Sequence, residues 1–505
     1  MPRGGAALLN QRMSITLRAR TALAVFMAAS AVGAFAAPRT THYGAYMNGR
    51  KIGRMSLSVE NTYVGGKARV RMTATSLLAI EMMGTEVRQE STVVSVCDEK
   101  LRPVSQQYTI SSNGSVMRLD ATYAARTVEV RLDTGASSSR KVLRVPSDGT
   151  LSADSSFLTL GGDVTVGSRM VVYYLNPLTV ALDRAVVTVE AKERVALNDE
   201  EYDAVRMTAT TPLGRIRTWE SPPGEVLWVE MPLGMAMYRM DEQAAGNAGT
   251  PEPTRRGAGA GSPGALRPPR DFAIATSVAA DRAIQAPRRV RRLTAEIGGV
   301  PDGGFVLQDA RQRVAAAPGR HGVYTFRIQA GATRASDCPL PVKRTELKRY
   351  LAAAAYLDMD RPEIRRIARS LRDPRSAQRT ASRIRSWLRR NLSPDYSIGV
   401  PRSATDVLKT RRGVCRDYAV LFGALARSAG LPTRLVGGLV YAEGRFFYHA
   451  WVECWTGAWT PFDATMDTDF VDATHMKFAQ GDPTDMMMVF AVVGKLSVKV
   501  LDSGA

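Results

Sequence analysis

Apolar and polar residues alternate along the first half of the chain with the period of a β-strand. Residues 69–72 (RVRM) and 128–132 (VEVRL) are two clear examples. Such alternation places one face of a strand in a core and leaves the other face in water. Helical periodicity is scarce in this region. We therefore expect residues 37–243 to form a β-rich domain whose antiparallel sheet curls around an apolar face.

Turn and linker signals divide the residues that follow. Residues 216–220 and 225–230 flank a Ser-Pro-Pro-Gly turn, a pattern typical of a β-hairpin with a short loop. Residues 244–270 are rich in glycine, alanine and proline and contain few core-forming side chains, which predicts a flexible exposed linker. Residues 271–340 again contain strand-like segments, and we expect a small β module there.

The pattern changes to the helical period after Thr345. Apolar residues spaced three and four apart predict two amphipathic helices. The two apolar stripes are Ile364, Ile367, Ala368 and Leu371, and then Ala377, Ala381, Ile384 and Leu388. Ser403 followed by Asp406 resembles a capping box that starts a short helix. With strands further on, residues 341–492 are expected to form a separate domain, and the expected fold class of the chain is α+β.

A strongly apolar helix is predicted for residues 417–428, which are mainly alanine, valine, leucine and phenylalanine. A helix that is apolar nearly all round is buried. Cys415 therefore lies at or just before the N-terminus of a central helix. The first-turn N–H groups and the helix dipole stabilise an anion there, which lowers the pKa of a cysteine and increases its thiolate fraction.

Two strands follow this helix, at residues 434–440 and 446–455. In the second strand, the residues of one face suit a core, namely Ala450, Val452 and Cys454. The other face carries His449, Trp451 and Glu453, and this places His449 where it can meet the N-terminus of the central helix. Residues 459–462 are expected to form an adjacent strand that ends at Asp463, whose carboxylate can accept a hydrogen bond from the imidazole.

Composition fits a folded protein of more than one domain. The chain has 505 residues, of which 45% are apolar, and a formal net charge of +20. This length favours two or three domains. The basic residues are scattered along the chain without a nucleic-acid recognition motif, so we expect no nucleic-acid partner. Association with the cell envelope or a membrane surface remains open.

The N-terminus has the features of a secretory signal. Arg18 and Arg20 precede an uncharged apolar run from Ala22 to Phe35, and small residues suited to signal peptidase follow near Ala36. The run is too short to be a good membrane span. Residues 1–36 are therefore predicted to be a signal peptide. The protein is expected to be exported, either to the periplasm, to the medium, or with an uncleaved N-terminal anchor.

The four cysteines have no regular spacing, so neither a disulfide framework nor a zinc site is expected. If Cys415 is a nucleophile it must stay free. Cys97 and Cys454 are interpreted as small buried apolar residues. We expect no metal ion and no cofactor.

Cys415, His449 and Asp463 together supply a thiol, an imidazole and a carboxylate, which are the parts of an acyl-transfer site. Each alone has an ordinary structural explanation: an inert buried cysteine, a structural histidine and a turn or capping aspartate. The chain has only four cysteines and four histidines. Here a cysteine is expected at a helix start, and a histidine and an aspartate are expected on two adjacent strands. This combination favours catalysis over three separate structural roles.

These motifs resemble the transglutaminase-like superfamily of papain-type thiol enzymes. The family pattern is a Gly-x-Cys helix start, a Gly-[Ile/Leu]-Pro-x-Arg turn, a His-Ala-Trp strand and a Trp-x-x-x-Asp strand. Matching residues occur in the same order at 413–415, 430–434, 449–451 and 459–463. The resemblance covers roughly residues 345–490. It implies a thiol-bearing helix packed against an antiparallel sheet.

The resemblance also implies roles for the three residues: Cys415 is the nucleophile, His449 the general base and acid, and Asp463 the acid that orients the imidazole. The leading hypothesis is an exported bacterial enzyme that hydrolyses amide bonds of a protein or peptide substrate through a thioester. Two alternatives remain. One is a true crosslinking transglutaminase, and the other is a catalytically silent module that binds a cell-envelope partner. His475 is interpreted as structural.

Overall fold

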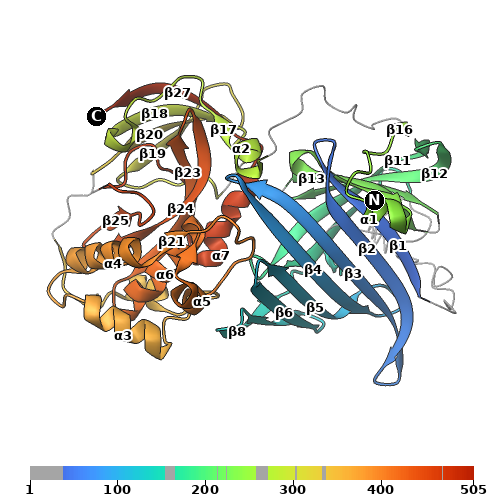
Figure 1. Cartoon of the computed structure of the whole chain (residues 1–505), viewed down its shortest axis with the longest axis horizontal. Helices are drawn as coiled ribbons and strands as arrows, with labels where there is room; N and C mark the ends of the chain where they lie inside the picture. The colour runs from blue at the N-terminus through green and yellow to red at the C-terminus, as the bar shows by residue number, and fades with distance from the viewer. Residues whose placement is uncertain are drawn as a thin grey trace, which may run out of the picture.

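The computed structural model describes residues 38–505 except 154–164, 213, 223, 257–270, 302–303, 332–336 and 469 (Figure 1). The predicted signal peptide and the second half of the predicted linker lie outside these described residues. Among the described residues, no helix combines the length and the apolar character that crossing a membrane requires.

A large, mostly antiparallel sheet makes up the N-terminal part, with sixteen strands of the described residues joined by hydrogen bonds. Two meanders build it, and they meet where β1 pairs with β15. The first meander consists of β1 (Arg39–Met47), β2 (Arg50–Val64), β3 (Lys67–Met82), β4 (Thr85–Cys97), β5 (Pro103–Ser112), β6 (Ser115–Tyr123), β7 (Thr127–Asp133) and β8 (Ser138–Arg144). The second consists of β9 (Thr150–Leu151), β10 (Arg169–Asn176), β11 (Ala181–Leu197), β12 (Glu200–Thr211), β13 (Gly214–Ser221), β14 (Glu225–Met231), β15 (Met235–Met240) and β16 (Arg255–Arg256).

This sheet curls as the alternating pattern predicts. In Figure 1 the blue strands of the first meander pass in front of the green strands of the second. The two ends of the sheet approach one another, since Lys141 Nζ on β8 donates to the carbonyl of Val180 at 3.0 Å. The predicted hairpin is confirmed, because Ser221 of β13 pairs with Glu225 of β14.

The first half of the predicted linker contains short ordered elements. They are α1 (Glu242–Gly246) and the strand β16. The Tyr46 hydroxyl of β1 donates to the carbonyl of Pro251 at 2.8 Å. This segment therefore lies against the N-terminal sheet as far as Arg256.

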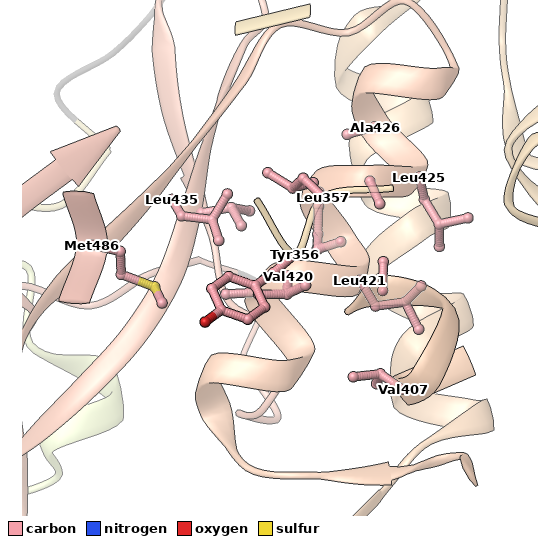
Figure 2. Packing of buried hydrophobic residues seen from close by; sticks show 14 of the residues in the cluster. Tyr356, Leu357, Val407, Val420, Leu421, Leu425, Ala426, Leu435 and Met486 are labelled. Carbon is pink, nitrogen blue, oxygen red and sulfur yellow. The ribbon is translucent and has the colours of Figure 1, made fainter. Parts of the chain in front are cut away.

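The central helix predicted from the sequence is α6 (Cys415–Ser428). Three helices pack around it: α3 (Pro362–Leu371), α4 (Ala377–Asn391) and α5 (Ala404–Thr410). Both predicted apolar stripes lie on the inner faces of α3 and α4, and the Ser403–Asp406 capping box is formed. Figure 2 shows Val420, Leu421 and Leu425 of α6 packed between neighbouring elements.

A five-stranded sheet lies against α6 in the order β17–β24–β23–β26, with β25 at the side of β24. Its strands are β17 (Val278–Ala279), β23 (Thr433–Ala442), β24 (Arg445–Trp455), β25 (Trp459–Phe462) and β26 (Met476–Gly481). The short helices α2 (Phe272–Thr276) and α7 (Pro483–Met486) and the two-stranded pair β21 (Ser393–Pro394) and β22 (Arg412–Gly413) complete this part. The three strands predicted from the sequence are present.

The small β module covers the opposite face of the five-stranded sheet. It consists of β18 (Arg292–Gly298), β19 (Gln312–Ala316), β20 (Tyr324–Gln329) and the C-terminal strand β27 (Ser497–Gly504). Phe326 of β20 packs on Phe478 of β26, with ring centroids 5.3 Å apart. The module is thus closed by the last strand of the chain, which lies outside the predicted range 271–340.

The N-terminal sheet and the helices share one hydrophobic core. Met117 and Leu119 of β6 belong to the same buried cluster as α3, α4 and α6. The Tyr356 hydroxyl lies 3.4 Å from the sulfur of Met117 and donates to the carbonyl of Leu178 at 3.3 Å. One rim of the curled sheet therefore packs directly on the part that carries the candidate site.

The expectation of an α+β class is wrong for the chain as a whole. About 50% of the structure is strand and 18% is helix, so the protein is mostly β. The N-terminal strands are long, reaching 17 residues in β11. In the described part of the chain, α-helices longer than five residues occur only between Pro362 and Ser428. The strong helical periodicity of that short stretch gave it too much weight in the prediction.

Candidate active site

Cys415 is the first residue of α6, as the sequence predicts. Val414 before it has an extended backbone, and its N–H donates to Asp417 Oδ2 at 3.0 Å. The helix begins at that point because the Asp417 carboxylate, three residues on, caps the chain end. The N–H groups of the first turn have no acceptor within a helix and point at the thiol end. Cys415 is partly exposed.

A buried ion pair fixes this helix start. Arg402 lies 3.1 Å from Asp417 Oδ2, and both side chains are almost fully buried. Arg402 also donates to the Thr410 hydroxyl at 3.0 Å. Gly413 leaves room for this arrangement, since a Cβ at that position would lie 2.6 Å from the Cβ of Asp417. The sequence analysis missed these residues, although Asp417 has the spacing of a capping box.

His449 and Asp463 are in direct contact. His449 Nε2 lies 2.7 Å from Asp463 Oδ2. The second oxygen, Asp463 Oδ1, accepts the Thr465 backbone N–H at 2.7 Å and its hydroxyl at 2.6 Å. A carboxylate held at both oxygens cannot rotate, so it fixes the tautomer and the direction of the imidazole. His449 comes from β24 and Asp463 directly follows β25, and the two strands pair side by side.

The His449 ring also reaches the thiol of Cys415. Because Nε2 is bonded to Asp463, Nδ1 is the nitrogen left for the sulfur. Burial alone would raise the pKa of Cys415, but hydrogen bonding and charge from His449, the Ala450 backbone N–H and Arg416 together lower it. The structure therefore brings the three predicted residues together, with Asp463 and Cys415 on opposite sides of one imidazole.

Electrostatics favour a charged pair. Burial opposes a charge on His449, yet the Asp463 carboxylate and the Cys415 sulfur outweigh it and raise the pKa of His449 to about 10. The carboxyl group of Asp463 responds in the opposite direction. Burial works against its charge, but His449 and His475 hold its pKa well below the usual range. A thiolate beside an imidazolium is the reactive form of such a site.

The two faces of β24 are both buried, which the alternation did not predict. Ala450, Val452 and Cys454 pack toward α6 as expected. On the other face, Glu453 is bonded to Arg434 at 2.7 Å and to Lys477 at 3.0 Å. Asp309 of the small β module pairs with Lys477 and so covers this second face at Glu453, whereas His449 is partly exposed.

His475 is the unexpected neighbour of the site. Its Nε2 lies 3.3 Å from Asp463 Oδ2, the same oxygen that contacts His449. Ligand atoms of His449, Asp463 and His475 lie within 4.8 Å of one another, so these three could hold a metal ion. A metal would have to displace the 2.7 Å hydrogen bond that orients His449. The donor set therefore fits a proton network better than a metal centre.

Three further aromatic residues lie near the start of α6, and they differ in burial and in partners. Tyr418, one turn into α6, is buried, and burial followed by the neighbouring Tyr396 raises its pKa. Tyr396 is 39% exposed and lies beside this helix turn. Trp387 stacks under Arg411, whose guanidinium carbon is 4.7 Å from the ring centroid.

None of the four cysteines forms a disulfide. Cys97 and Cys454 are fully buried, which confirms their prediction as apolar core residues. Cys338 is partly exposed like Cys415, but burial and the nearby Asp337 raise the pKa of its thiol. The pKa shifts of the two partly exposed thiols are therefore opposite in direction: the pKa of Cys415 is lowered and that of Cys338 is raised.

The sequence of this region matches a known family. A sequence model of the transglutaminase-like superfamily matches residues 365–464, a span that contains Cys415, His449 and Asp463. This part of the chain is a transglutaminase-like domain. The prediction from the four motifs is confirmed, and the domain is typical of a cysteine-type enzyme family.

Similar proteins were also found by direct comparison. An uncharacterized protein of Mycobacterium leprae is 37% identical over 121 residues, which covers 21% of this chain and 40% of that protein. The chain thus spans about two-fifths of the length of that relative. A solved protein of Cytophaga hutchinsonii, described as a "putative cysteine protease", is 19% identical, with a TM-score of 0.30 over 43% of this chain and 85% of that one. A "putative protease" of Parabacteroides distasonis is 12% identical, with a TM-score of 0.20 over 79% of this chain and 69% of that one.

Proposed function

We propose that this protein is an exported, cysteine-dependent acyl-transfer enzyme that hydrolyses amide bonds of proteins or peptides through a thioester. The observation that carries the proposal is the position of His449, which contacts Cys415 on one side and Asp463 on the other. A thiol at a helix start, beside an imidazole held by a buried carboxylate, has the parts that nucleophilic acyl transfer requires.

In the acylation step, the Cys415 thiolate attacks the carbonyl carbon of the amide. The first-turn N–H of Cys415 faces the region where the oxyanion develops and donates to it. The C–N bond then breaks, and the His449 imidazolium gives its proton to the departing amine. The acyl group remains on sulfur as a thioester, and His449 is left neutral.

In the deacylation step, neutral His449 takes a proton from water while the water oxygen attacks the thioester. The C–S bond breaks, the carboxylic acid product leaves, and Cys415 returns to the thiolate beside a protonated His449. Asp463 keeps the ring in place through both steps and stabilises its positive charge. The steps use only water, so no second substrate site is needed.

Export is proposed from residues 1–36, whose charge and apolar pattern fit a signal peptide. The substrate would then be a protein or peptide outside the cytoplasm. Mass spectrometry of the protein recovered from cell fractions tests this. An amino terminus near Ala37 in the envelope or medium is expected, whereas a protein that keeps residues 1–36 in the cytoplasmic fraction contradicts export.

Activity can be tested without knowing the natural substrate. A pool of denatured proteins with blocked amino groups is incubated with the full chain, and newly formed amino termini are labelled and sequenced by mass spectrometry. Cys415→Ala should produce none above background, and Cys338→Ala, the matched control at the other accessible thiol, should behave like the wild type. A labelled primary amine in a parallel sample reports crosslinking.

Three outcomes are informative. New termini that depend on Cys415 support hydrolysis. Incorporation of the amine without new termini replaces hydrolysis with crosslinking. If neither occurs, and a thiol-reactive probe labels the Cys415→Ala variant as strongly as the wild type, the site is silent and the proposal is lost.

A further inference from the structure

His475 lies between two carboxylates. Its Nε2 is 3.3 Å from Asp463 Oδ2, and its Nδ1 is 3.2 Å from the backbone carbonyl of Asp472 and 3.4 Å from Asp472 Oδ1. The side chain is 1% exposed, so water cannot replace these partners. It precedes β26 by one residue and reaches back to the end of β25.

Each of these partners can only accept a hydrogen bond. A carbonyl oxygen has no proton to give, and the ionised Asp463 carboxylate has none either. A neutral imidazole has one N–H and one bare nitrogen, and so would point a lone pair at one of these oxygens. Both contacts are favourable only when both ring nitrogens of His475 carry a proton.

Further charged groups lie beyond the two carboxylates that flank His475. Arg288 lies 3.0 Å from Asp472 Oδ2 on the far side. These side chains form a row of contacts in the order Arg288, Asp472, His475, Asp463, His449 and Cys415. With a proton on both ring nitrogens of His475, the charges along this row alternate in sign. In a low-dielectric interior such an arrangement is far more favourable than an unpaired buried charge.

The small β module holds this segment in place. Arg311 donates to the carbonyl of His475 at 2.8 Å and also to the carbonyl of Asp472. The nearest other charged groups, Lys477, Glu453 and Asp309, pair with one another rather than with the ring. The indole of Trp451 packs against the imidazole at a right angle, with centroids 5.3 Å apart. The two ring nitrogens of His475 therefore face only the acceptors of Asp463 and Asp472. Two positive groups also lie close, since the His449 ring packs edge to face on the His475 ring with centroids 5.7 Å apart and Arg311 binds the backbone of the same segment.

We propose that His475 is a permanently protonated positioning residue that holds the Asp463 carboxylate toward His449 and offsets part of its negative charge. This inference rests on the proposed function, because the role matters only if His449 serves Cys415. His475 itself touches neither substrate nor the reacting sulfur.

The proposed charge has a consequence of definite sign. With His475 protonated, Asp463 attracts the proton of His449 less strongly than an uncompensated carboxylate would. Glutamine at position 475 can still donate an amide N–H to Asp463 but carries no charge. The proton on His449 should then be held more tightly, and the pKa of His449 should rise. A purely structural role predicts that the pKa of His449 falls in this variant. The Asp463 carboxylate would then be displaced and would stabilise the protonated imidazole less.

The chain suits a direct test, because it has only four histidines. The full chain is labelled with ¹⁵N in its histidine rings, and the ring nitrogens are followed by NMR across pH. At pH 7, both nitrogens of His475 should be protonated. In His475→Gln, the midpoint of the His449 titration should move up by about one pH unit or more. His42→Gln, the same exchange on the distant strand β1, should leave the midpoint unchanged.

An unprotonated ring nitrogen on His475 at pH 7 overturns the proposal. An unchanged or lowered His449 midpoint in a folded His475→Gln variant overturns it as well. If that variant does not fold, the measurement on the wild-type ring decides. None of these readouts needs a substrate, so failure of the proposed enzymatic activity and failure of the His475 assignment give different results.

Discussion

At the scale of single residues, the site depends on the charge of Asp463. Burial opposes ionisation of both His449 and Cys415, so neither would be charged in an apolar pocket alone. The Asp463 carboxylate reverses this for His449 and raises its pKa to about 10. The protonated ring in turn lowers the pKa of Cys415. The thiolate is therefore supported by a carboxylate that it does not touch.

Asp463→Asn removes this charge with almost no change of shape. The pKa of His449 should fall, because the ring loses its counter-charge while its burial remains. The thiolate–imidazolium pair should then be lost at a lower pH. Amide turnover at pH 7 should fall by about 10²–10⁴-fold, the usual contribution of general acid–base catalysis. Asp467→Asn, the same exchange at a side chain that is 89% exposed nearby, is the control. Equal turnover of the two variants would contradict the role of Asp463.

The sequence predicted these three residues because each sits in a local motif. A helix start and the alternation along a strand place Cys415 and His449 without knowledge of the rest of the fold. The contact of His475 with Asp463 was not predicted. It depends on how the turn before β26 folds back across β25, and no local pattern encodes that approach. Arg288 and Arg311 were missed for the same reason.

At the scale of elements, the start of α6 determines where the thiol points. The Asp417 carboxylate caps Val414 and pairs with Arg402 inside the protein. Loss of this carboxylate would leave the buried Arg402 guanidinium without a counter-charge. The helix start would also lose its cap, so the position of Cys415 depends on a pair that takes no part in the chemistry.

Asp417→Ala should destabilise the folded protein by about 3–5 kcal/mol, the usual effect of removing one partner of a buried pair. Urea unfolding followed by circular dichroism measures this. Glu363→Ala, in the first turn of α3, should change the free energy of unfolding by no more than about 0.5 kcal/mol, as surface substitutions do. If the two variants unfold at the same urea concentration, the cap and its ion pair do not hold the helix start.

Elements were predicted well where periodicity was strong. The apolar stripes of α3 and α4, the capping box of α5 and the strands around His449 all have the expected residues. Prediction was weaker for β24, where both faces are buried. Alternation implied that Glu453 and Trp451 faced away from a core, but both are buried. Glu453 pairs with Arg434 and Lys477 of the same sheet, and Lys477 in turn pairs with Asp309 of the small β module.

At the scale of the whole molecule, the N-terminal sheet and the transglutaminase-like domain share a hydrophobic core. Met117 and Leu119 are completely buried among residues of the helices. Elements joined by such a core unfold together, because exposing either part exposes apolar surface of both. The sheet is therefore expected to stabilise the candidate active site.

Met117→Ala should destabilise both parts together by about 2–5 kcal/mol. The loss of strand signal in circular dichroism and the exposure of the core cysteine Cys454 to a thiol reagent should occur at the same, lowered urea concentration. Met83→Ala removes a methionine that is 47% exposed and is the matched control. Two separate transitions, with Cys454 protected after the sheet has unfolded, would contradict a shared core.

The fold class was the part of the architecture that sequence patterns misjudged. The α+β expectation rested on helices that occupy a short stretch, whereas the long strands of the N-terminal sheet decide the class. Pairing of β27 with β18 joins residues about 200 positions apart, and the shared core joins the sheet to the helices. Such long-range contacts come from tertiary packing, which local periodicity does not specify.

The central claim is that Cys415 is an activated nucleophile, and alkylation of its thiol tests this most directly. Iodoacetamide is added to the full chain at pH 7, and the modification of Cys415 and Cys338 is followed by mass spectrometry in the same sample. Both thiols are partly exposed, but the pKa of Cys415 is lowered and that of Cys338 is raised. We predict that Cys415 reacts faster by about tenfold or more, and that His449→Ala removes this advantage. Equal rates for the two thiols, or an advantage that survives in His449→Ala, would contradict the account.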